Sequence, residues 1–414
     1  MAADARPRED VRMHGFSQRA EVGAVLEWID ANAQPLGSER EPLDRASGRI
    51  LAEQVIAPID VPAFDRSAMD GYALHGDETS GASDYNPIAF AVIGQALPGR
   101  PFDGLVTTSS AVRIMTGAAV PSGADAVVPA EYAREEKGQV EITLAVSPSK
   151  HIGHRGEDIL AGAAVLERGR CLRPQDAGLL ASLGIAEIPV VRQPRVRIIV
   201  TGNEVVAPGE PKGEHQIYDA NSAMLRGLVA RDGGLIESHH RLGDEPARIR
   251  DALTAPGADV VLVSGGSSVG AEDHAPRLLA EVGTLAIHGV AMRPSSPAGV
   301  GSIGDTLVFL LPGNPVSCLC AYDFFAGRAI RAIGGLPKPW PYRSVRATLG
   351  RKISSPIGRL DYARVTLENG RVEPLSVGGA SILSSTTRAD GFVIVGDDSE
   401  GYPAGAEVDV WLYA

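Results

Sequence analysis

The sequence predicts a multidomain α/β protein with a parallel α/β sheet domain, a β-rich domain and a small C-terminal β-barrel or sandwich. A length of 414 residues corresponds to two or three domains. Residues 48–146 contain short β-branched runs separated by Gly and Pro, whereas residues 195–335 alternate apolar strands, Gly-rich turns and helical patterns. After the Pro-rich segment 336–341, the Asn369-Gly370 pair between two strand-like runs predicts a β-hairpin.

The first half of the chain is predicted to contain one amphipathic helix, several short strands and one further helix. Ser17 is a suitable N-cap for a helix over residues 18–32, where apolar residues recur at helical spacing. Strands are expected at 88–93, 112–115, 126–128 and 140–144. A loop over 151–158 precedes a short helix at 176–183, which ends at Gly184.

The second half is predicted to contain a parallel sheet. Strands at 196–200, 260–263 and 307–311 each run into a Gly-rich turn, and helical patterns are expected at 223–230, 246–253, 273–280 and 316–330. This alternation places a ligand crevice at the carboxyl ends of the strands.

Composition excludes several function classes. With 39 basic and 51 acidic residues the net charge is −12, so we expect neither nucleic acid nor an anionic membrane as a partner. No apolar run approaches the ~20 residues of a membrane span and no signal sequence is recognisable, so we expect a cytoplasmic protein. The three cysteines, Cys171, Cys318 and Cys320, are interpreted as reduced core residues.

Three acidic residues are candidate ligands of a cation. Glu204 directly follows a predicted strand, and Asp273 follows the small-residue loop 264–270. Asp244 lies in another loop of the same predicted sheet. Together they could hold Mg²⁺, which prefers a few carboxylates plus substrate phosphates and water. Asp244 and Asp273 are equally interpretable as helix N-caps, and the loop as a tight turn.

Two other segments could bind an anion. Pro312-Gly313-Asn314-Pro315 opens a predicted helix, where backbone N–H groups can face an oxyanion, although a plain strand-to-helix turn would look the same. The segment 292–297 contributes Arg293, Ser295 and Ser296, which suit a tetrahedral oxyanion but also a solvated loop.

The β-rich half adds two charged loops. Asp70 lies in 64–72, where an Asx-turn at Asp70-Gly71 is at least as plausible as a presented loop. Asp158 ends the charged loop 154–158. No Ser/His/Asp or Cys/His arrangement stands out, and the nine His residues lack zinc-ligand spacing.

Taken together, seven motifs resemble those of the molybdopterin molybdenumtransferases (MoeA, and the E domain of gephyrin), in the same order along roughly residues 16–414. The motifs are residues 64–73, 113–128, 156–159, 201–204, 217–221, 264–270 and 311–315. The resemblance implies an elongated homodimer. Its protomer would have a segmented linker domain (12–60 and 151–190), an inserted β-rich domain (61–150), a molybdopterin-binding α/β domain (191–335) and a C-terminal β-barrel (340–414).

The resemblance also implies an activity. Enzymes of this family take adenylylated molybdopterin and molybdate and, with Mg²⁺, release AMP and form the molybdenum cofactor. Other cofactor-biosynthesis proteins or acceptor molybdoenzymes are the implied protein partners.

Site residues follow from matching the motifs. Glu204, Asp244 and Asp273 would be catalytic and hold the metal, with Asp70 and Asp158 reaching the site from the other protomer. The implied cofactor-binding residues are Ser264, Gly265, Gly266, Ser267, Arg293, Ser295, Ser296, Pro312, Gly313, Asn314, Pro315 and, from the barrel, Ser384 or Ser385.

One segment departs from the family pattern. Where the family carries Lys-x-x-x-Lys-Pro-Gly-Lys-Pro, this chain has residues 289–297, in which Arg293 keeps one charge and Gly289 and Ser296 keep none. Loss of two cations weakens an oxyanion site. Three functions therefore stay open: an active molybdate-inserting enzyme with a variant pocket, a paralogue that binds and delivers the cofactor without insertion, and a dimeric scaffold.

Overall fold

The computed structural model describes residue 16 and residues 19–266, 273–376 and 379–413. Contacts divide the chain into two compact units, and each is described by itself. The first unit contains residues 1–39 and 191–414, and the second contains residues 40–190.

The first unit contains a six-stranded mixed sheet. Its strand order is β16-β13-β17-β21-β20-β18. The strands are β13 (Arg195–Thr201), β16 (Leu235–Leu242), β17 (Val260–Ser264), β18 (Thr284–His288), β20 (Gly299–Ile303) and β21 (Thr306–Leu311). The predicted strands are confirmed and pair in parallel, together with β16. The antiparallel strands β20 and β18 at one edge were not predicted.

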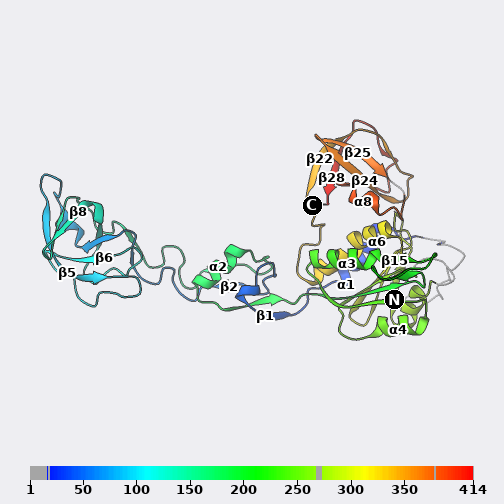
Figure 1. Cartoon of the computed structure of the whole chain (residues 1–414), viewed down its shortest axis with the longest axis horizontal. Helices are drawn as coiled ribbons and strands as arrows, with labels where there is room; N and C mark the ends of the chain where they lie inside the picture. Colours follow the sequence, from blue (N-terminus) through cyan, green and yellow to red (C-terminus); the bar gives the residue numbers. More distant parts are fainter. Residues whose placement is uncertain (1–15, 17–18, 267–272, 377–378, 414) are drawn as a thin grey trace, which may run out of the picture. The chain divides into compact units, whose positions relative to one another are not determined.

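Helices cover both faces of this sheet because its strands are apolar on both sides. Ile198 and Val200 of β13 pack in one core cluster, and Ile199 packs in the other. The first face carries α1 (Val22–Asn32), α3 (Ala220–Arg231) and the helical run 315–333, and the opposite face carries α4 (Pro246–Thr254) and α5 (Ala275–Val282). Figure 1 shows α1, α3 and α6 on one side of the sheet and α4 on the other.

Several predicted helix ends need correction. The first helix begins at Val22, with Glu21 at the N-cap; Ser17 lies outside the described residues. The N-caps of α4 and α5 are Glu245 and His274, so the interpretation of Asp244 and Asp273 as caps is wrong.

The predicted helix 316–330 is a composite run. It consists of α6 (Pro315–Ala321), a π-helical turn (Tyr322–Ala326) and α7 (Gly327–Ile333).

The C-terminal strands close a five-stranded barrel. Their order is β24-β25-β22-β28-β26, and β24 also pairs with β26. The strands are β22 (Ser344–Leu349), β24 (Leu360–Glu368), β25 (Arg371–Ser376), β26 (Gly391–Val395) and β28 (Glu407–Leu412). The predicted hairpin is confirmed: Asn369 and Gly370 have φ of 50° and 76°, as a type I′ turn requires.

Short elements complete the first unit. They are β14 (Val205–Val206), β15 (Ile217–Tyr218), β19 (Met292–Arg293), β23 (Ile353–Ser354), β27 (Gly401–Tyr402) and α8 (Ser384–Thr387). Strand β19 pairs in parallel with β24, with Arg293 opposite Asp361, so the loop before β20 is fixed to the barrel.

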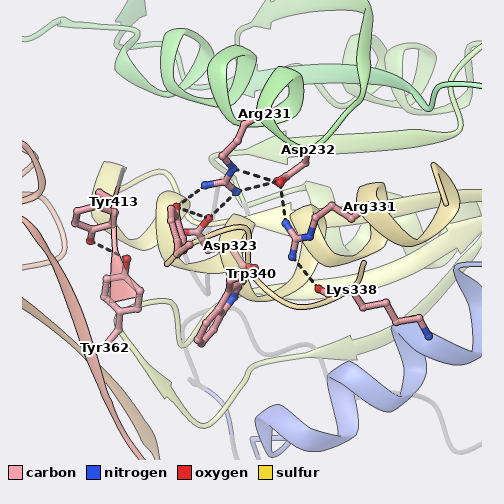
Figure 2. A network of polar contacts seen from close by, with 9 residues as sticks. Arg231, Asp232, Asp323, Arg331, Lys338, Trp340, Tyr362 and Tyr413 are labelled. Carbon is pink, nitrogen blue, oxygen red and sulfur yellow. Dashed lines mark hydrogen bonds and ion pairs between the residues drawn. The ribbon is translucent and has the colours of Figure 1, made fainter. Parts of the chain in front are cut away.

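A buried ionic network lies between α3, the π-helical turn and the segment leading into the barrel (Figure 2). Arg231 contacts both Asp232 and Asp323, at 2.8 and 3.0 Å. Tyr342 donates to Asp323 at 3.0 Å. Burial raises the pKa of the Asp323 carboxyl to about 6, although Arg231 opposes this shift. The network joins the α/β sheet domain to the barrel at its sequence boundary.

The second unit contains another six-stranded sheet, of order β7-β4-β6-β5-β9-β8. Its strands are β4 (Gly71–Leu74), β5 (Ile88–Ala96), β6 (Ser110–Ile114), β7 (Ala126–Pro129), β8 (Ala133–Glu136) and β9 (Gln139–Ile142). Outside this sheet lie β1 (Ser38–Pro42), β2 (Val55–Ile56), β3 (Arg66–Ser67), β10 (Ile152–Gly153), β11 (Ala164–Leu166), α2 (Pro174–Ser182) and β12 (Glu187–Val191). The β-rich prediction is confirmed, including all four strands it named.

The cysteines only partly match expectation. Cys318 and Cys320 are buried in the first unit, and burial raises the pKa of both thiols. Cys171 is exposed, so its interpretation as a core residue is wrong. Among the described residues, no helix is long and apolar enough to span a membrane.

Candidate functional site

The three predicted carboxylates lie on one cavity of about 880 Å³ in the first unit. Glu204, Asp244 and Asp273 all line it, beside residues at the carboxyl ends of β13 and β17 and in the turn directly after β21. We call it the acidic cavity. It occupies the crevice that the parallel sheet predicts, because the loops after parallel strands meet at one edge.

Reciprocal hydrogen bonds hold two of the acidic loops together. The N–H of Asn203 donates to Oδ2 of Asp244, and the N–H of Asp244 donates to Oδ1 of Asn203, both at 3.2 Å. Asp244 is thereby positioned next to the Glu204 loop. In the described parts of the chain, no three acidic, His or Cys side chains are close enough to hold a metal ion by themselves.

Small residues and prolines form the wall of the acidic cavity. Ser264, Gly265 and Gly266 line it together with the predicted turn 312–315. Gly265 has φ of 93°, and a Cβ there would lie 2.4 Å from the carbonyl oxygen of Thr201, so only glycine fits. Ser267 lies outside the described residues.

Asn221 connects two parts of this wall by hydrogen bonds, a role that was not predicted from the sequence. Its side-chain Nδ2 donates to Ser264 Oγ at 2.9 Å and to the carbonyl oxygen of Gly313 at 2.8 Å. Asn221 is buried near the start of α3, where the side chain of Asp219 caps the helix by accepting from the N–H of Ser222. The motif 217–221 was the available signal, but it did not reveal which residue would reach the wall.

A second cavity, of about 810 Å³, adjoins the first. Arg293, Ser295 and Ser296 line it, together with two arginines that the sequence analysis did not select, Arg19 and Arg359. We call it the basic cavity. The two cavities share Pro297, Pro312 and Asn314 in their linings. The predicted cofactor-binding residues therefore divide between two neighbouring cavities.

A buried carboxylate lies beneath the arginines of the basic cavity. Asp361 of β24 is fully buried and forms an ion pair with Arg293, and its Oδ1 lies 3.3 Å from Nε of Arg359. This pairing fixes both guanidinium groups at the junction with the barrel. Two cations and one anion leave a net positive charge.

Two donors around the basic cavity are unsatisfied. The Nε of Arg293 and the Oγ of Ser296 are buried and have no hydrogen-bond partner in the described part of the chain, whereas the Nε of Arg359 faces Asp361. Buried donors in native proteins normally have a partner, and a tetrahedral oxyanion offers several acceptors. Ser295 is different, because its hydroxyl donates to the carbonyl oxygen of Ser317 at 2.6 Å and holds the loop against α6.

The barrel reaches the acidic cavity through residues other than those expected. Ser381 and Leu383 line it. Ser384 is exposed and absent from the lining, and the Ser385 hydroxyl donates to the carbonyl oxygen of Ile382 at 2.6 Å.

Asp70 and Asp158 lie in the second unit. Oδ1 of Asp70 accepts from the N–H and the hydroxyl of Thr116, both at 2.7 Å, and these bonds lower the pKa of its carboxyl. The carboxylate thus connects two distant loops and does not form a local Asx-turn. Asp158 is exposed at the end of its loop.

Comparisons with known proteins agree with this architecture. Three family profiles match in order: "MoeA N-terminal region (domain I and II)" over residues 20–184, "Probable molybdopterin binding domain" over 197–332 and "MoeA C-terminal region (domain IV)" over 346–413.

Curated relatives match over nearly the whole chain. Molybdopterin molybdenumtransferase 2 of Mycobacterium tuberculosis is 37% identical, over 89% of this chain and 94% of the relative. The molybdopterin molybdenumtransferase of Haemophilus influenzae is 35% identical, over 91% of this chain and 94% of its own length.

Solved structures show the same fold. A MoeA protein of molybdopterin biosynthesis from Pyrococcus horikoshii, 32% identical, covers 96% of this chain and 100% of its own, with a TM-score of 0.82. The chain therefore belongs to the MoeA family of molybdopterin molybdenumtransferases, which confirms the resemblance seen in its motifs. It is a transferase of molybdenum cofactor biosynthesis.

Proposed function

We propose that this chain inserts molybdate into adenylylated molybdopterin and releases AMP in a Mg²⁺-dependent reaction. One observation carries the proposal: a cavity lined by four carboxylates, Asp219 and the predicted Glu204, Asp244 and Asp273, adjoins a cavity lined by three arginines, and the two share a wall. A pyrophosphate accompanied by a cation suits the acidic cavity, and molybdate suits the basic one.

The donors of the acidic cavity fit Mg²⁺. Carboxylate oxygens are the ligands this ion prefers, and it is usually held by one or two carboxylates with water and substrate phosphates, so a complete protein cage is not needed. One or two of the predicted ligands Glu204, Asp244 and Asp273 would hold it. When bound, the ion would supply Lewis-acid neutralisation of the pyrophosphate charge.

The chain's own residues would orient the reactants. The Asn221 hydrogen bonds to Ser264 and Gly313 keep the wall in one arrangement, and Asp244 is held by Asn203. A water or a molybdate oxygen would attack the phosphoanhydride, so no side-chain nucleophile is required. Preorganised groups of this kind stabilise developing charge without reorganising during the reaction.

AMP release tests the proposal. Purified protein is incubated with adenylylated molybdopterin, Mg²⁺ and molybdate, and AMP is quantified by chromatography. Appearance of AMP that depends on both Mg²⁺ and molybdate supports insertion. Tight molybdopterin binding without AMP would instead favour the paralogue that delivers the cofactor.

We further propose a homodimer in which Asp70 and Asp158 act at the site of the second copy. Both lie in the second unit, in the motifs 64–73 and 156–159 that resemble those of the family, which supports a role for them in the site. Mixing inactive Glu204→Gln and Asp70→Asn variants tests this. If the site is shared, random subunit exchange makes half of all dimers heterodimers, each with one intact site, and about a quarter of wild-type activity returns. Recovery of no activity, or a monomer in sedimentation, would contradict the shared site.

A further inference from the structure

An N-terminal segment lies against the loop that enters the basic cavity. The N–H of Ala20 donates to the carbonyl oxygen of Gly289 at 3.0 Å, and the N–H of Ala291 donates to that of Ala20 at 2.8 Å. The ring of Phe16 meets that of His288 edge-on, with centroids 4.9 Å apart. Two backbone hydrogen bonds and one aromatic contact thus anchor the described part of this segment.

Phe16 occupies the space next to Gly289. Gly289 has φ of 89°, and a Cβ built there would lie 2.4 Å from Cδ1 of Phe16. A side chain at position 289 is therefore excluded by both backbone conformation and the aromatic ring. The position where a cation was expected from the family pattern is covered by the N-terminal segment.

The same segment brings a different cation. Arg19 lines the basic cavity with Arg293 and Arg359. Its guanidinium carbon lies 5.9 Å from the ring centroid of Phe16, within the range of a cation–π contact. Arg293 and Arg359 share Asp361, whereas Arg19 has no ion pair in the described ranges.

We propose that Arg19 is an oxyanion-recognition residue of the basic cavity and that Phe16 positions it. The inference rests on the proposed function, because the oxyanion is the one that function requires. It names the source of the positive charge that Gly289 cannot provide. The unsatisfied donors of Arg293 and Ser296 mark the place where the oxyanion binds, and Arg19 adds charge from the solvent side, since it is exposed.

The test is direct binding of molybdate alone to the full chain by isothermal titration calorimetry at fixed low ionic strength. Arg19→Ala is expected to weaken affinity about tenfold or more, as for loss of one charge-assisted hydrogen bond. Arg100→Ala is the matched control, because Arg100 is also exposed but lies in the second unit. Unfolding curves are measured in parallel and should not change, since Arg19 is exposed.

Phe16 is tested by a double-mutant cycle. If Phe16 acts through Arg19, Phe16→Ala weakens binding, and the double variant binds no more weakly than Arg19→Ala alone. Fully additive losses would contradict positioning by Phe16.

The outcomes separate the two proposals. If the wild type binds molybdate and Arg19→Ala binds equally well, the role of Arg19 is wrong and the proposed function stands. An equal loss in Arg100→Ala would show a general charge effect and would also overturn the role of Arg19. If the wild type binds no molybdate and releases no AMP, the proposed function fails and the inference fails with it.

Discussion

The acidic and basic cavities share part of one wall but are built in different ways. The carboxylates of the acidic cavity come from loops of one parallel sheet, each close after a strand or before a helix. The arginines of the basic cavity come from the N-terminal segment, the short strand β19 and the turn before β24. A site built at one sheet edge is visible in local sequence patterns, whereas a site built from remote segments needs the tertiary structure.

The largest expected effect is a loss of folding stability when the buried carboxylate beneath the basic cavity is removed. Asp361→Ala leaves Arg293 and Arg359 without their buried counter-charge, and removing one partner of a buried pair costs roughly 3–5 kcal/mol. The free energy of unfolding is measured by urea titration with tryptophan fluorescence. Asp409→Ala is the control: its pair with Arg346 is exposed, and exposed pairs contribute about 0–1 kcal/mol. Equal losses for the two variants would show that Asp361 does not support the basic cavity.

Removing one carboxylate charge from the acidic cavity should slow AMP release and leave molybdate affinity unchanged. Glu204→Gln is expected to lower the rate of AMP release roughly 100- to 1,000-fold, the range seen when one charge-stabilising group is removed. Molybdate affinity should stay at the wild-type value, because Glu204 does not line the basic cavity. Glu214→Gln, at an exposed position outside both linings, is the control. Parallel losses of rate and molybdate affinity would mean that the two cavities act as one.

Asp323 lies outside the linings of both cavities. Substituting it should therefore change only the stability of the fold. Its folded pKa of about 6 lies above the ordinary value of 3.8, so the folded state binds more protons between these values. The stability contributed by this group is therefore present below pH ~4 and lost as the pH rises through ~6. Relative to Asp323→Asn, the wild type should lose unfolding free energy over that window in urea titrations, and the difference should be constant above it. A flat difference from pH 4 to 7 would contradict the raised pKa.

The smallest effect is expected on the KM for adenylylated molybdopterin, from substitutions in the barrel segment 381–384. Ser384→Ala should change the KM for adenylylated molybdopterin by less than about twofold, because Ser384 is exposed and outside the cavity lining. Ser381→Ala, at a lining position, should raise KM more than Ser384→Ala does. The reverse order would indicate that the barrel segment moves when substrate binds.

Much of the fold followed from local patterns. The predicted strands, the helices of the α/β sheet domain and the Asn369-Gly370 hairpin are confirmed, because alternation, capping and turn chemistry act over a few residues. The π-helical turn within the run 315–333 and the antiparallel strands β18 and β20 were not predicted. Their form depends on packing against the rest of the sheet.

Some residues of the candidate site were likewise predictable from local sequence, and others depend on tertiary contacts. Local sequence determined that Glu204, Asp244 and Asp273 line one cavity, because each lies in a loop at the same edge of a parallel sheet. It could not determine that Arg359 would share Asp361 with Arg293, or that Phe16 would cover Gly289 and place Arg19 nearby. Those contacts join segments up to several hundred residues apart, and no local periodicity encodes them. The order and chemistry of the loops were determined by the sequence alone, and the charge of the basic cavity was decided by tertiary packing.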